Sequence, residues 1–205
     1  MSEDEKDGKQ KKPFFVLRCL AYIIDGFLVL FLSALLSAPF VNSDQMLELA
    51  EESRSIVQKY SQNEMTEQEY LVEASNLEYK MSRSMELISI FIILVSVVYY
   101  VVLPIFLNGQ TLGKKIFGMK IISTYGDLNA NQLIFRSFLA DFLLLNIISV
   151  LFLMFASRNI YLNCIELFTL AQYTITFASI IMVIVNKEGL AIHDGLVHTK
   201  VVKVK

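Results

Sequence analysis

Hydrophobic runs with few or no charges alternate with polar segments along the chain, and four of the runs are long enough to cross a membrane. They cover residues 14–40, 87–107, 133–155 and 167–185. A helix needs about 20 mostly apolar residues to span the hydrocarbon core of a bilayer. The pattern therefore predicts an all-α membrane protein with four transmembrane helices.

The polar segment between the first two runs, residues 41–84, has the pattern of two amphipathic helices. It lacks Gly and Pro, and it carries nine acidic against four basic residues. Apolar residues recur at helical spacing, and Thr66 with Glu69 has the spacing of a capping box. We expect an extracytoplasmic helical hairpin, which serves either as a solvated insertion or as a partner-binding surface.

The second run ends in a Gly- and Lys-rich stretch, residues 108–122, which we call the basic elbow. Its glycines permit a tight exit from a membrane helix. Residues 116–123 and 199–204 both have strand-like sequences and both lie next to a predicted span. We expect them to pair as a small cytoplasmic β-ribbon.

Two other interpretations of the sequence fail on spacing and composition. A nucleotide-binding P-loop needs four residues between its first Gly and its Gly-Lys-Ser/Thr end, but only three separate Gly109 from Gly113, and Lys115 replaces the Ser or Thr. A cleaved signal peptide would have a shorter apolar region, without Arg18 and Asp25 and without Pro39 beside the cleavage site.

Lysine and arginine positions set the expected orientation in the membrane. The 18 basic and 20 acidic residues nearly cancel, but bases gather beside the two chain ends and in the basic elbow, which predicts that these lie in the cytoplasm. Residues 1–12 have a disordered-tail composition. Cys19 and Cys164 fall at opposite membrane faces in this topology, so we expect free thiols.

The first and third spans each contain one Arg and one Asp: Arg18 with Asp25, and Arg136 with Asp141. A charge within a span is costly unless it is paired or hydrated. The economical arrangement pairs Asp25 with Arg136 and Arg18 with Asp141. Such a cluster is either a proton or cation site, with Asp25 near the middle of the membrane as its candidate carboxylate, or a structural clasp.

The last polar segment contains His193, Asp194 and His198. Their spacing fits no common metal-ligand pattern, so we expect no metal site. Asp194 is instead expected to bind backbone N–H groups at the membrane surface, including those of the basic elbow.

These motifs together resemble the RDD family of small bacterial membrane proteins. Arg18 and Asp25 match the Arg and first Asp of the family name, Asp194 is the better candidate for the second Asp, and Asp141 is the alternative. The matching cytoplasmic motif comprises Gly109, Gln110, Thr111, Gly113, Lys114, Gly118, His193, Asp194 and Thr199. The helical insertion is longer than usual for the family, and Val197-His198 replaces small residues before Thr199.

The resemblance implies a single membrane domain over residues 13–205 in the bacterial plasma membrane. It also implies sodium–proton exchange by analogy, so the leading hypothesis is a transporter or a transporter accessory subunit, which we expect to form a homo-oligomer. The alternative is a non-transporting scaffold that binds another membrane protein through the hairpin. We expect anionic lipid headgroups as cytoplasmic partners, but no nucleic acid, cofactor or enzymatic activity.

Overall fold

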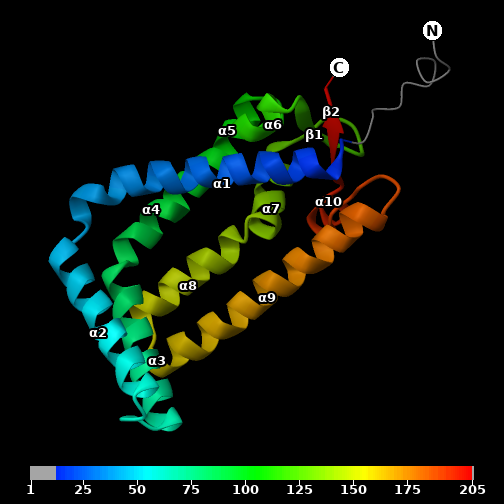
Figure 1. The fold of residues 1–205 in the computed structure, drawn as a ribbon. Helices are drawn as coiled ribbons and strands as arrows, with labels where there is room; N and C mark the ends of the chain where they lie inside the picture. Colours follow the sequence, from blue (N-terminus) through cyan, green and yellow to red (C-terminus); the bar gives the residue numbers. More distant parts are fainter. Residues whose placement is uncertain (1–12, 205) are drawn as a thin grey trace.

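The computed structural model describes residues 13–204, so the predicted tail, residues 1–12, lies outside the described residues. Three helical stretches are long and apolar enough to cross a membrane: Phe15–Phe40, Glu86–Phe106 and Arg158–Val185. The first is α1 (Phe15–Ser37) with its 3₁₀ extension η2 (Ala38–Phe40). The second comprises α4 (Glu86–Ser96), the π-helix η3 (Val97–Val102) and α5 (Leu103–Phe106), and the third is α9 (Arg158–Val185). The predicted helical membrane fold is confirmed at this level (Figure 1).

Large apolar side chains cover the outward faces of these helices. A water-soluble protein rarely leaves so much contiguous apolar surface exposed, whereas a bilayer solvates it. The exposed side chains on α1 and α9 include Phe27, Phe31, Leu35, Leu167, Leu170, Tyr173 and Phe177.

The predicted third span, residues 133–155, is not one straight helix. It consists of α7 (Ala130–Ala140) and α8 (Leu143–Phe155), which are bent by 62° at the break between them. Phe142 occupies the break with a left-handed backbone at φ 50°, which costs a non-glycine residue about 1–3 kcal/mol. The bent pair is a fourth candidate span if both helices count together.

The predicted fourth span, residues 167–185, begins too late, because the sequence between residues 156 and 164 suggests a short loop. Helix α9 begins at Arg158, directly after Ser157, and continues for 28 residues. Two asparagines, Asn159 and Asn163, give this stretch a polar composition that suggests a loop, but the structure carries both within the helix.

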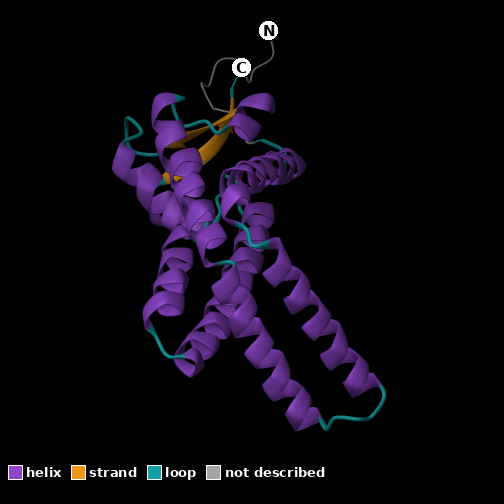
Figure 2. Ribbon diagram, turned by 90° about the vertical axis from the view of Figure 1, so that its left-hand side faces the viewer, coloured by secondary structure: helices purple, strands orange, loops and turns teal. Residues whose placement is uncertain are grey.

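The predicted helical hairpin is present as α2 (Ser43–Ser61) and α3 (Glu67–Ser84), and it projects away from the sheet (Figure 2). The capping box is confirmed: Thr66 N donates to the Glu69 carboxylate at 2.9 Å, and Glu69 N donates to Thr66 Oγ1 at 3.3 Å. The hairpin has its own apolar core, formed by Leu49, Ile56 and Leu77.

The predicted ribbon is also confirmed: β1 (Met119–Ser123) pairs antiparallel with β2 (Thr199–Lys203) at the opposite end of the molecule. Each strand follows a five-residue helix that the sequence did not predict, α6 (Leu112–Ile116) and α10 (Ile192–Leu196). The core beneath the ribbon joins four elements, because Ala21 of α1, Leu133 of α7 and side chains of both strands pack together. This packing brings α1, α6, α7 and α10 to one place.

Candidate functional site

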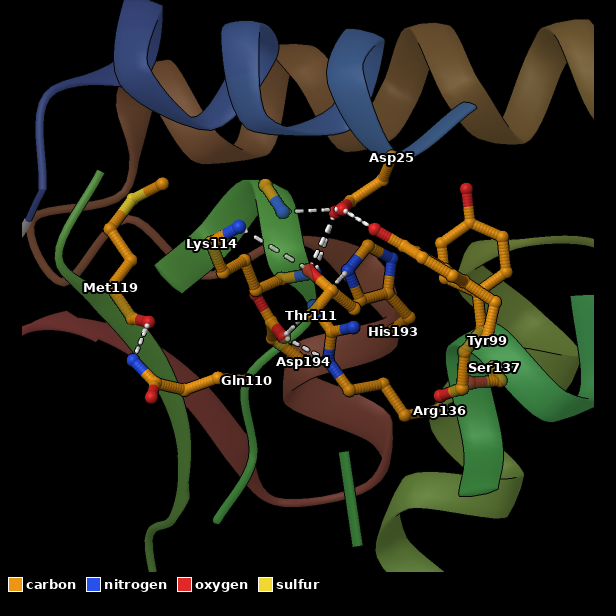
Figure 3. A network of polar contacts seen from close by, with 12 residues as sticks. Asp25, Tyr99, Gln110, Thr111, Lys114, Met119, Arg136, Ser137, His193 and Asp194 are labelled. Carbon is orange, nitrogen blue, oxygen red and sulfur yellow. Dashed lines mark hydrogen bonds and ion pairs between the residues drawn. The ribbon is translucent and has the colours of Figure 1, made fainter. Parts of the chain in front are cut away.

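Asp25 points from α1 into the basic elbow and accepts three hydrogen bonds there (Figure 3). The donors are the Tyr99 hydroxyl at 2.6 Å, the Thr111 hydroxyl at 2.6 Å and the Gly113 backbone N–H at 2.7 Å. Only 1% of the Asp25 surface is exposed. A carboxylate with three donors is well stabilised despite its burial.

Local sequence explains why each donor is in place. Thr111 is the N-cap of α6, so its side chain and the free N–H groups of the first turn face the same direction. Tyr99 lies in the π-helix just before Pro104, which has no N–H to continue an ordinary helical ladder. A Cβ at position 113 would collide with the Ala21 carbonyl oxygen, so only glycine allows this approach.

Lys114 is the cation beside Asp25. Its Nζ lies 3.7 Å from Asp25 Oδ2 and donates to Thr111 Oγ1 at 3.2 Å. Burial lowers the pKa of Lys114, and the nearby Arg136 charge acts in the same direction, whereas Asp25 opposes both. The ammonium therefore sits in a polar cage whose main counter-ion is Asp25.

A second buried carboxylate, Asp194 of α10, forms the other half of the site. Arg136 Nη2 lies 3.1 Å from Asp194 Oδ1, and Arg18 Nη1 lies 3.9 Å from Oδ2. Arg18 also donates to two backbone oxygens, Gly189 O at 2.6 Å and Val201 O at 3.0 Å. One carboxylate thus joins α1, α7 and α10.

Charges around Asp194 shift the pKa values of this cluster. Burial raises the pKa of Asp194, but the Arg136 and Arg18 charges together with the Ala191 N–H lower it below the ordinary range. Burial and the Arg136 charge lower the pKa of His193 to about 3. Arg136 Nη2 lies 3.2 Å from His193 Nε2, where a neutral imidazole nitrogen can accept its hydrogen bond. His193 is therefore uncharged at neutral pH.

Both predicted cross-helix ion pairs are wrong. Asp25 pairs with Lys114 and not with Arg136, and Arg18 lies beside Asp194 and not beside Asp141. The reason is that α6 and α10 fold back between the long helices and supply partners at shorter range. Asp194 binds backbone as expected, since it accepts from Ala191 N at 3.3 Å. The elbow N–H that it was expected to bind goes to Asp25.

Asp141 is the third carboxylate, at the break between α7 and α8, where it lines a cavity of about 330 Å³. Within residues 13–204, no basic side chain comes within 4 Å of its carboxylate. The wall is mostly apolar and is formed by Phe15, Cys19, Ala21, Tyr22, Ile23, Leu139, Phe142, Ile175, Thr176, Ser179, Ile180 and Val183. Arg18, Lys114, Arg136, His193 and Asp194 also reach it.

The remaining motif residues shape the backbone. Gly109 (φ 81°) and Gly118 (φ 60°) take left-handed turns on either side of α6. Gln110 Nε2 donates to Met119 O at 2.8 Å, and the Thr199 hydroxyl donates to Asp194 Oδ1 at 3.4 Å. Cys19 and Cys164 are free, as predicted.

Tyr99 is the site residue that sequence reasoning missed. It lies in an uncharged run where every residue fits a membrane helix, so nothing in the hydrophobic pattern separates it. The available signal was a Tyr-Tyr pair a few residues before Pro104, because a proline in a span displaces the preceding backbone and turns side chains out of register.

Comparison with known proteins gives one match. The model of the RDD family matches residues 12–198, nearly the whole chain. No curated protein and no solved structure matches the sequence.

Proposed function

Because the chain belongs to the RDD family, we propose that it is a four-span bacterial membrane transporter that exchanges a cation for protons at Asp141. The observation that carries this proposal is the break of the α7–α8 pair at Asp141, on the wall of a cavity. Broken membrane helices with an ionisable residue at the break form the binding sites of many secondary transporters.

The break supplies suitable ligands. The last turn of a helix leaves carbonyl oxygens without partners inside the helix, and α7 ends at the residue before Asp141. These oxygens and the Asp141 carboxylate are the hard oxygen donors that small cations and protons prefer. Tyr22 lines the same cavity.

The two other buried carboxylates serve a different purpose. Asp25 is held by three donors and Lys114, and Asp194 is held by Arg136, Arg18 and its own helix. A carboxylate so fully engaged cannot take up and release a cation without disassembling the contacts that hold α6 and α10. We therefore assign Asp25 and Asp194 to structure and Asp141 to exchange.

The proposed topology places the ribbon and both chain ends in the cytoplasm of the bacterial cell and the hairpin outside. The positive-inside rule supports it, because Lys115, Lys120, Lys200 and Lys203 surround the ribbon. These lysines would contact anionic headgroups, each contributing about 1 kcal/mol near the surface. Four membrane helices are few to enclose a transport pathway, so we expect a homo-oligomer.

The test is proton flux in proteoliposomes that contain the purified full chain. An imposed sodium or potassium gradient should drive proton movement, and Asp141→Asn should abolish it while the melting temperature in detergent changes little. Asp25→Asn should instead lower the melting temperature, because it removes the anion from a hydrogen-bonded cage. Flux that survives in Asp141→Asn, or no flux in the unmodified protein, overturns the proposal.

The alternative function is a scaffold that binds a membrane protein through the hairpin. It is favoured by apolar side chains exposed on α2 and α3, namely Leu47, Val57, Leu71 and Val72. Absence of flux, together with a co-purifying protein that is lost when residues 44–82 are deleted, would support the scaffold. Retention of every co-purifying protein by the deleted form would exclude it.

A further inference from the structure

Two segments of the chain fold alike at a constant sequence offset. Each begins with a left-handed glycine, Gly109 (φ 81°) or Gly189 (φ 66°), and continues through a five-residue helix, α6 or α10. Each helix is followed by a residue with positive φ, Gly118 (60°) or His198 (54°), and then by a five-residue strand. The matching order of turns, helix and strand indicates that the two segments are a structural repeat.

The ribbon relates the two segments by an approximate two-fold axis. Ile121 faces Val201, its counterpart in the other segment. The hydrogen bonds at the two ribbon ends are also counterparts: Thr124 N donates to His198 O at 2.9 Å, and Val204 N donates to Gly118 O at 2.6 Å.

The likeness extends to the long helices. We call the half of the chain that ends with β1 the first unit and the half that ends with β2 the second. In the first unit, α1 contacts α4 and α6. In the second, the α7–α8 pair contacts α9 and α10. Each unit thus has two long helices, a short helix and a strand, and the α2–α3 hairpin is an addition to the first unit. We treat Asp141 in the second unit as the counterpart of Asp25, since each follows an arginine of the first helix in its unit, Asp25 within α1 and Asp141 directly after α7.

The second unit lacks the groups that hold Asp25 in the first. At the same sequence offset, the counterparts of Thr111, Gly113 and Lys114 are Ala191, His193 and Asp194. Ala191 has no hydroxyl, and position 193 carries an imidazole where position 113 has no side chain. Where the first unit has a packed carboxylate cage, the second has Asp141 beside an open cavity.

We propose that this cavity binds a primary organic ammonium ion, a proposal that rests on the transport function above and specifies its substrate class. The first unit already holds a primary ammonium group beside its carboxylate. The Nζ of Lys114 lies 3.7 Å from Asp25 Oδ2, and only 16% of the Lys114 side chain is exposed. In the second unit, the N–H groups of an alkylammonium ligand would donate to Asp141, in place of the protein donors that Asp25 has in the first unit. The apolar walls of the cavity of about 330 Å³, including Tyr22, Ile175 and Ile180, would contact its carbon chain.

The other charges at the cavity leave room for this cation. Arg136 and Arg18 are held by Asp194, and Arg18 is also held by two carbonyl oxygens. Lys114 is held by Asp25. A proton on Asp141 and an ammonium ion beside ionised Asp141 give the cluster the same total charge.

The test uses isothermal titration calorimetry of the detergent-solubilised full chain with n-butylammonium, tetramethylammonium and sodium. n-Butylammonium should bind, and tetramethylammonium, which has no N–H donor, should bind at least about tenfold more weakly. Asp141→Asn should weaken the binding of n-butylammonium by a similar factor. Ser179→Trp, which fills the cavity from α9, should abolish binding, whereas Thr174→Trp on the exposed side of α9 should not.

The outcomes separate this inference from the proposed function. Equal binding of n-butylammonium and tetramethylammonium, or undiminished binding by Asp141→Asn with an unchanged melting temperature, overturns the ammonium site. Sodium-driven proton flux without n-butylammonium binding overturns the substrate class and leaves exchange intact. Specific binding of n-butylammonium without flux of any cation supports the site and overturns transport.

Discussion

The close contact between α1 and α6 depends on one missing side chain. Gly113 lets its backbone N–H reach Asp25, and an added Cβ would lie 2.7 Å from Asp25 Oδ1 and would also collide with Ala21 O. Gly113→Ala should therefore force the helices apart and destabilise the protein by about 1–3 kcal/mol, the usual cost of overpacking. Thermal melting in detergent measures this change.

Gly195→Ala is the matched control, because Gly195 is also a glycine of a five-residue helix, yet nothing lies within 4 Å of its added Cβ. It should leave the melting temperature unchanged or raise it slightly. Similar melting temperatures for the two variants would show that the Asp25 contact does not depend on Gly113.

Stability should fall on mild acidification because of His193. Its pKa is about 3 in the folded protein against 6.5 ordinarily, so the unfolded chain binds a proton at a pH where the folded chain does not. The stability due to neutral His193 is fully present above pH 6.5 and is lost as the pH falls toward 3, by at most about 1.4 kcal/mol per pH unit. Melting curves between pH 7 and 5 test this, and His193→Gln should flatten the dependence.

His198→Asn is the control for the acid effect. His198 stacks edge-on against Tyr125, away from the arginine cluster, and asparagine tolerates its left-handed backbone. This variant should keep the pH dependence of the unmodified protein. If it flattens the curve as much as His193→Gln does, the assignment to His193 is wrong.

Which residues are buried and ionisable could be predicted from sequence, but which of them pair could not. Arg18, Asp25, Arg136 and Asp194 all stand out as charges in or beside apolar runs. Their partners depend on α6 and α10, two five-residue helices too short to give a periodic signal. The choice of Lys114 over Arg136 as the partner of Asp25 follows from where those helices fold back.

At the scale of elements, long apolar runs and β-branched segments were predicted well, because their signal accumulates over many residues. The break at Phe142 was not, since neither Gly nor Pro lies near it and the single charge of Asp141 does not by itself end a helix. The start of α9 was placed too late because Asn159 and Asn163 resemble a loop. In both cases tertiary packing overrides local composition.

The α2–α3 hairpin should unfold independently of the ribbon end. Leu77 is 6% exposed within the hairpin's own core of Leu49, Ile56 and Leu77. Leu77→Ala should cost about 2–5 kcal/mol locally and should speed amide hydrogen exchange over residues 43–84 while residues 109–123 keep their protection. Leu71→Ala, at a position 58% exposed, is the control and should change neither region.

At the scale of the whole molecule, the two ends should face opposite sides of the membrane. Glu64 lies in the α2–α3 turn and Asp127 in the turn after β1, and both are exposed. In a background with Cys19→Ser and Cys164→Ser, we expect a membrane-impermeant maleimide to label Glu64→Cys in intact cells and Asp127→Cys only after the cells are opened. The reverse pattern would invert the topology, and labelling of both in intact cells would show that Glu86–Phe106 does not cross the membrane.

The contacts of Arg18 have a consequence for the timing of folding. Its two backbone acceptors lie 171 and 183 positions further along the chain. At about 5–20 residues per second, synthesis of that length takes roughly 10–40 s. Throughout that interval Arg18 has been made, while the two backbone oxygens that accept its hydrogen bonds have not. These contacts between α1 and the end of the chain therefore form only after the α10–β2 segment has been made, late in synthesis.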